Sequence, residues 1–183
     1  MKKILNFLKT LLNLFKKEFG AKSISEQISL PVISSLFDDS ERIARSVFTP
    51  LNIKKDNSLK NNVFRTPSEM DEVSVNRLEF TNADFIKEIS KKIENPERDR
   101  TYFGIAILNV HEILFSKCTV VYTPKTEPFS NPFHSDIKVG FVPKRGETLP
   151  AEIAYKIDLL TNKARFYIDP NTAVEDWTGA ELL

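Results

Sequence analysis

The sequence predicts an α+β fold: a single, mostly antiparallel sheet with helices packed on one face, preceded by an N-terminal amphipathic helix. Two observations favour this class. Short runs rich in Val, Ile, Phe and Tyr are separated by short connections, which suit antiparallel pairing. Two longer stretches with a 3.6-residue apolar period interrupt those runs. The chain has 183 residues and is 41% hydrophobic, which predicts one domain with an appendage.

The first 22 residues predict the leading helix. Apolar residues fill one half of its helical wheel and polar residues the other, and Gly20 is a suitable stop. Four interpretations of the apolar half are open: it packs on the protein's own core, in a partner protein's groove or on a membrane surface, or it belongs to a cleaved signal peptide. Docking to a partner or a membrane would use the apolar residues Leu5, Leu8, Leu12, Phe15 and Phe19.

The formal net charge of +1 hides an asymmetry. Six lysines against Glu18 give residues 1–22 a charge of +5, whereas the remainder holds 20 basic and 24 acidic residues. A general nucleic-acid binder spreads basic charge over its folded surface, so we expect nucleic acid to be an unlikely partner. A protein partner is expected, a membrane surface is an alternative, and the location is expected to be the cytoplasm, with peripheral attachment to the inner face of the membrane as an option.

Residues 23–62 predict short helices and a linker. DDSERIARSVF, residues 38–48, has the apolar spacing of a short helix that ends at Thr49-Pro50. The polar stretch LNIKKDNSLKNN, residues 51–62, predicts an exposed loop that joins the N-terminal helices to the main domain.

Residues 63–183 predict the α+β domain. Strands are expected over 63–65, 73–80, 102–110, 118–123, 134–142 and 165–168, and helices over 81–95, with Thr81 as its cap, and 149–164. HEILFSK fits a helical turn or a continuing strand, and PKTEPFSNPF, with three prolines, must be loop. The tail is expected to add a short helix with Trp177 docked.

Composition excludes several kinds of chemistry. Five glycines leave no phosphate-binding glycine loop. The single cysteine, Cys118, excludes an internal disulfide and thiolate zinc sites, and its apolar setting predicts an inert thiol. With two histidines we expect no metal site and no cofactor.

FSNPFHSDIKV holds the most suggestive pair of residues. On a strand, His134 and Asp136 share one face, so the carboxylate could orient the imidazole as catalytic histidines require. An ordinary solvated strand face is the alternative. Nearby, Arg65 and Arg77 could clamp a phosphate or carboxylate, although pairing with surface acids explains them equally well.

The segments SERIARSVFTPLNI, NNVFRTP, DEVSVNRLEF and NPFHSDI, within residues 40–142, resemble uncharacterised bacterial domains of toxin and anti-phage operons. The resemblance implies an accessory subunit of a multiprotein system, and it carries over no site residue.

Two functions from different classes follow. The first is a non-enzymatic accessory protein that docks through its leading helix. The alternative is a small hydrolase or transferase that uses His134, oriented by Asp136, with Arg65 and Arg77 binding an anionic substrate.

The docking hypothesis predicts the effect of a deletion. A chain without residues 1–20 should unfold as cooperatively as the full chain but lose its partner or its lipid in affinity purification and vesicle flotation. Loss of cooperative unfolding would instead place the helix in the core.

Overall fold

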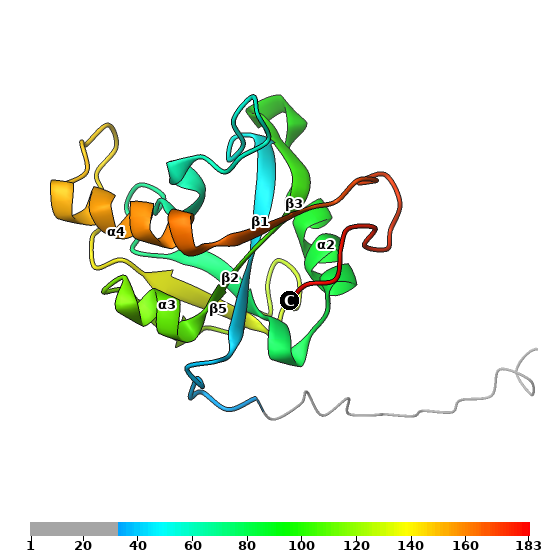
Figure 1. The fold of residues 1–183 in the computed structure, drawn as a ribbon, viewed down its shortest axis with the longest axis horizontal. Helices are drawn as coiled ribbons and strands as arrows, with labels where there is room; N and C mark the ends of the chain where they lie inside the picture. Colours follow the sequence, from blue (N-terminus) through cyan, green and yellow to red (C-terminus); the bar gives the residue numbers. More distant parts are fainter. Residues whose placement is uncertain (1–32) are drawn as a thin grey trace, which may run out of the picture. The chain divides into compact units, whose positions relative to one another are not determined.

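A six-stranded sheet organises the computed structural model, which describes residues 33–183 (Figure 1). The strand order is β4-β5-β2-β1-β3-β6, and the registered pairs are all antiparallel. The strands are β1 (Arg42–Pro50), β2 (Val73–Arg77), β3 (Arg100–Asn109), β4 (Thr119–Tyr122), β5 (His134–Lys138) and β6 (Arg165–Ile168). The helices are α2 (Ala83–Lys92), α3 (Val110–Phe115) and α4 (Ala151–Lys163), with 3₁₀ turns η1 (Asn61–Phe64), η2 (Leu78–Phe80) and η3 (Pro96–Arg98). The α+β class and the single antiparallel sheet are confirmed. The expected helix over 1–22, with its contact residues Leu5, Leu8, Leu12, Phe15 and Phe19, lies outside the described residues.

The helix expected over residues 38–48 is wrong, because those residues lead into a central strand. β1 pairs with β3 along its whole length, from Arg42↔Asn109 to Pro50↔Arg100. A central strand buries both faces, so its apolar residues do not alternate with polar ones. The adjacent pairs Ile43-Ala44 and Val47-Phe48 therefore have the spacing of a helical stripe.

The stretch that follows β1 is also more ordered than an exposed linker. Asn52 and Ile53 are buried, and Ile53 bridges to Leu59. Residues 61–64 form η1 rather than the start of a strand, and they bury Val63 and Phe64. The described compact unit begins at Ile33, so the boundary expected at residue 63 falls inside it.

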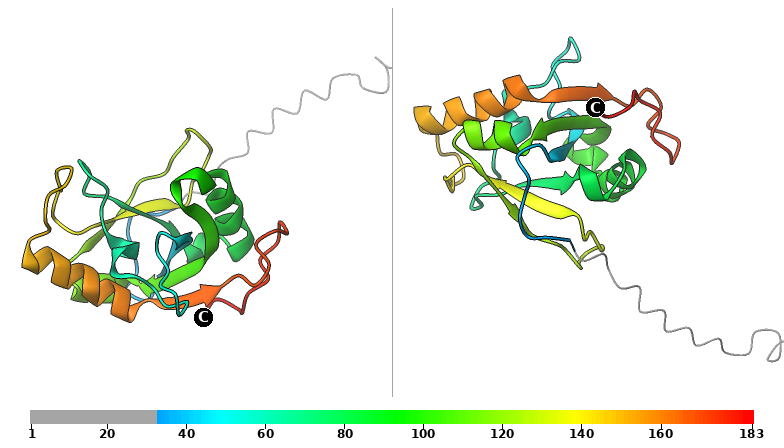
Figure 2. Two further views of the ribbon diagram at one scale, coloured as in Figure 1. Left: turned by 90° about the horizontal axis from the view of Figure 1, so that it is seen from above. Right: turned by 60° about the horizontal axis from the view of Figure 1, so that its bottom comes forward.

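Helices cover both faces of the sheet, not one. Ile43 and Val47 pack in a core cluster with residues of α3 and α4, whereas Ala44 and Phe48 pack with Ile86 of α2. Figure 2 shows α4 and α2 on different sides of the strands. The expectation failed because several strands carry apolar residues on both faces, which requires two covering layers.

The other elements follow the sequence closely. Asn82, not Thr81, caps α2, and its side chain accepts from the Phe85 backbone N–H at 2.9 Å. HEILFSK contributes to α3, which begins with a capping box between Asn109 and Glu112. The tail forms no helix, but Trp177 packs against the α2 cluster as expected. No helix among residues 33–183 is long and apolar enough to cross a membrane.

Candidate anion-binding cleft

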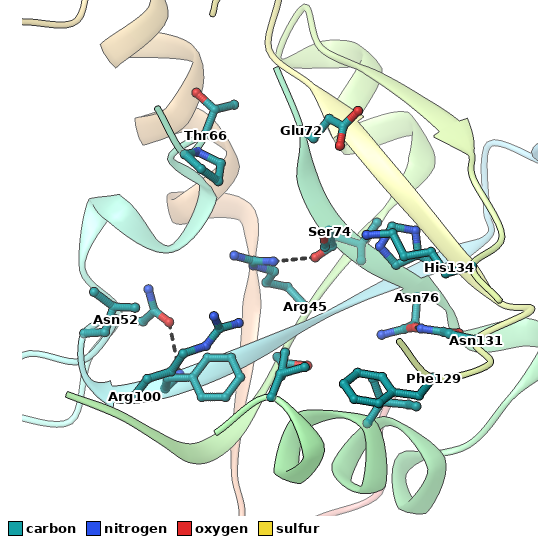
Figure 3. A pocket seen from close by; sticks show the side chains of 18 of the residues that line it. Arg45, Asn52, Thr66, Glu72, Ser74, Asn76, Arg100, Phe129, Asn131 and His134 are labelled. Atoms are coloured by element: carbon teal, nitrogen blue, oxygen red, sulfur yellow. Dashed lines mark hydrogen bonds between the residues drawn. The ribbon is translucent and has the colours of Figure 1, made fainter. Parts of the chain in front are cut away.

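The strands β1 and β2 diverge and leave a cleft between them. They pair only at Ile43↔Arg77 and Ala44↔Asn76, although β1 continues to Pro50. Beyond Ala44 the space between them opens into a cavity of about 530 Å³, which we call the β1–β2 cleft (Figure 3). Its basic lining residues are Arg45, Arg65, Arg100 and Lys125, and its acidic ones are Glu72 and Glu127. Amide side chains come from Asn52, Asn62, Asn76 and Asn131, and apolar ones include Phe48, Leu51, Ile89, Ile93 and Phe129.

Two arginines of this cleft, Arg45 and Arg100, differ from the other buried or partly buried arginines of the described chain. Arg42, Arg77 and Arg165 each lie within 4 Å of a glutamate, namely Glu79, Glu41 and Glu112. Arg45 and Arg100 are also partly buried, but neither has a carboxylate partner among residues 33–183. Both line the β1–β2 cleft. Partly buried guanidinium groups without a counterion concentrate positive charge there.

Backbone carbonyls hold Arg45 in place. Its Nη1 donates to the Ser74 carbonyl at 2.5 Å and its Nε to the Val63 carbonyl at 3.3 Å, so the side chain spans the gap between β1 and β2. Burial, reinforced by the like charge of Arg100 and opposed by Asp136, lowers the pKa of Arg45 to about 10. The group is still protonated at neutral pH, so a charge is held there without a carboxylate in contact with it. An anion in the cleft would supply that compensation.

Arg100 is held by an aromatic ring instead. Its guanidinium carbon lies 4.6 Å from the centre of the Phe48 ring. Its Nε is buried and has no hydrogen-bond partner among the described residues. Burial lowers the pKa of Arg100 as well. A guanidinium that lines a cleft without a carboxylate partner is suited to bind carboxylate or phosphate oxygens.

The structure brings His134 and Asp136 together through Thr123. His134 Nδ1 lies 2.8 Å from the Thr123 carbonyl, so we assign the ring proton to Nδ1. The Thr123 hydroxyl donates to Asp136 Oδ2 at 2.7 Å. His134 Nε2 is 3.9 Å from Asp136 Oδ1, and both atoms are buried without a hydrogen-bond partner in the described part of the chain. The ring is thus oriented by Thr123, and Asp136 acts on it indirectly.

His134 is a neutral group in the wall of the cleft. It is 4% exposed, and burial lowers its pKa in spite of the opposing charge of Asp136. Its side chain lines the cleft, whereas Asp136 is 1% exposed and is not part of the lining. The strand face that carries this pair is therefore buried rather than solvated.

The two arginines expected to act together are separated. Arg65 is exposed and lines the cleft. Arg77 is 1% exposed and lies outside the cleft lining, in a two-point ion pair with Glu41. Its guanidinium is fully used in holding the segment before β1. Arg65 therefore shares the cleft with Arg45 and Arg100 instead.

Sequence reasoning missed Arg45 and Arg100. Arg45 stood in the segment expected to be helical, and Arg100 lay between the helix expected over 81–95 and the strand expected over 102–110. The available signal was the position of Arg45 among apolar residues, since a charged side chain in a buried strand needs a partner or a function.

Cys118 has the inert setting that its sequence predicted. It is 2% exposed within the cluster beneath α3 and α4, and burial raises the pKa of its thiol to about 11. Among residues 33–183 no three His, Cys, Asp or Glu side chains are grouped as metal ligands.

Comparisons with family models, with curated proteins and with solved structures find no match to this chain. Fold and site together define an α+β domain with a basic cleft where two central strands diverge.

Proposed function

We propose that this domain binds an anionic small molecule in the β1–β2 cleft. The observation that carries the proposal is that Arg45 and Arg100, alone among the buried or partly buried arginines of residues 33–183, lack a carboxylate partner, and that both line the same cavity. Arg65 and Lys125 add positive charge near the opening. The cavity volume is in the range of small-molecule sites, which is about 300–1,000 Å³.

Binding is better supported than catalysis. A general base must reach a substrate proton, but His134 Nε2 is buried and directed toward Asp136 Oδ1 rather than left open to the cleft. Its Nδ1 is engaged by Thr123. The hydrolase or transferase alternative would require this ring to move before it could act. The docking role of the leading helix concerns residues outside the described range, and it is compatible with a ligand-binding domain.

The proposal predicts a selective loss of anion binding on Arg100→Gln. Calorimetry of the full chain with inorganic phosphate and with citrate should show affinity at least 10-fold weaker than wild type, because a charge-assisted hydrogen bond contributes about 1.5–3 kcal/mol. Wild-type affinity should also fall as sodium chloride is raised. Folding should be retained, since Arg100 has no ion pair to lose among the described residues.

Arg98→Gln is the matched control, because Arg98 is exposed in the neighbouring turn and does not line the cleft. It should bind both anions as wild type does. The proposal would be overturned if the two variants weakened anion binding equally, or if the wild type bound neither phosphate nor citrate.

A further inference from the structure

The β1–β2 cleft has two chemically different ends. Figure 3 shows Arg100 and Asn52 at one end and Phe129, Asn76 and Asn131 at the other, with Arg45 drawn between them. Arg45 and Arg100 both line the cleft, and Figure 3 draws the two side chains in the same part of it. Such a pair suits a group with more than one negative charge, and a phosphate monoester carries about −1.5 to −2 at pH 7.

An apolar surface lies on the side of the cleft that faces α2. Ile89 and Ile93 line it from α2 and the turn after it, and Phe129 lines it from the proline-rich loop. The Phe129 ring is only partly buried. A bare anion would leave this surface in water, whereas a flat aromatic body would cover it and stack on the ring.

Two buried side-chain atoms of lining residues lack a hydrogen-bond partner among residues 33–183. Asn62 Oδ1 is an acceptor, and Thr66 Oγ1 can donate or accept. Asn62 is held by its own amide, which donates to the Leu51 carbonyl at 2.9 Å. A ligand that satisfies these atoms must carry hydroxyl or amino groups as well as negative charge.

We infer that the ligand is a nucleoside monophosphate. This inference rests on the proposed function and specifies its ligand class. The phosphate binds between Arg45 and Arg100, the base stacks on Phe129, and hydroxyl or amino groups of the ligand donate to the free acceptors. The cavity of about 530 Å³ leaves room for such a molecule and is far larger than a phosphate ion requires.

Calorimetry on the full chain tests this with four probes: adenosine 5′-monophosphate, cytidine 5′-monophosphate, adenosine and inorganic phosphate. At least one nucleotide should bind 10-fold or more tightly than either adenosine or phosphate. Phe129→Ala should weaken nucleotide binding about 10-fold, as loss of base stacking does, and leave phosphate binding unchanged. Arg100→Gln should weaken both.

Phe115→Ala is the matched control, because Phe115 is 64% exposed on α3 and does not line the cleft. It should bind all four probes as wild type does. The nucleotide inference would be overturned, and the anion proposal left intact, by the following result: Arg100→Gln weakens phosphate binding, the nucleotides bind no more tightly than phosphate, and Phe129→Ala has no effect. If no probe binds, and citrate does not bind, both fail. Tighter binding of a short oligonucleotide than of any mononucleotide would also overturn the inference.

Discussion

Lys87→Met should destabilise the domain by about 3–5 kcal/mol, measured by urea denaturation at pH 7.5. Lys87 and Asp169 form an ion pair of 2.7 Å in which neither side chain is exposed. The Lys87 ammonium also donates to the carbonyls of Asn171 at 3.0 Å and Asp176 at 2.7 Å. Methionine would leave the Asp169 carboxylate buried without its cation.

The loss should depend on pH in a defined direction. Burial by itself would raise the pKa of Asp169, but hydrogen bonds from Lys87 and Thr178 hold it below its ordinary value in the folded chain. A lowered folded pKa contributes stability that is present above the unfolded pKa of about 3.9 and is lost as pH falls through the folded pKa. Without Lys87 the folded pKa should rise above the unfolded value instead. The difference in stability between wild type and Lys87→Met should therefore shrink as pH falls from 7.5 to 4.

Two further variants separate charge from packing. Lys92→Met removes an exposed pair with Glu88 on the same helix and should cost less than about 1 kcal/mol. The double variant Lys87→Met with Asp169→Leu removes both buried charges and should recover part of the loss. If the double variant is as unstable as Lys87→Met alone at every pH, the unpaired Asp169 carboxylate is not the cause of the lost stability.

The sequence predicted those elements whose apolar residues follow the regular spacing of a single helix or strand. α2 and α4 each have one apolar stripe, and β3, β4, β5 and β6 coincide with short apolar or alternating runs. β1 was missed because it lies between β2 and β3 with both faces covered, so adjacent residues enter different clusters. For the same reason the helices were expected on one face only. Local pattern does not tell a two-sided strand from a short helix.

Only part of the candidate site could be predicted from the sequence. His134 and Arg65 do line the cleft, but the charge that defines it comes from Arg45 and Arg100. Whether an arginine is structural or free for a ligand depends on which carboxylate the fold brings to it. Arg77 meets Glu41 across 36 positions of sequence, whereas Arg45 meets only backbone carbonyls. That distinction needs the register of β1 against its neighbours, which the sequence pattern did not supply.

Arg77→Ala should destabilise the domain by about 3–5 kcal/mol, because it leaves Glu41 buried without its cation. The Arg77 Nε and Nη2 donate to the two oxygens of Glu41 at 2.5 and 2.7 Å, and Nη2 also donates to the Leu36 carbonyl at 2.9 Å. The guanidinium lies 4.1 Å from the ring centre of Phe37 and 4.6 Å from that of Phe80. Arg77 thus holds the segment before β1 against the sheet, and urea denaturation should show the lower free energy of unfolding of the variant.

Arg42→Ala is the control for this variant. Arg42 pairs with Glu79 at the surface, where the side chains are 32% and 42% exposed, so its loss should cost less than about 1 kcal/mol.

Arg77→Lys supplies the second comparison, since a lysine keeps the charge but cannot form the two-point contact. It should lower stability yet bind inorganic phosphate with wild-type affinity under conditions where it is folded. A loss of phosphate binding in folded Arg77→Lys, as large as in Arg100→Gln, would mean that the structural role assigned to Arg77 is wrong and that it acts with the cleft. The contrast therefore tests the central distinction of the molecule, between arginines neutralised by the chain and arginines left for a ligand.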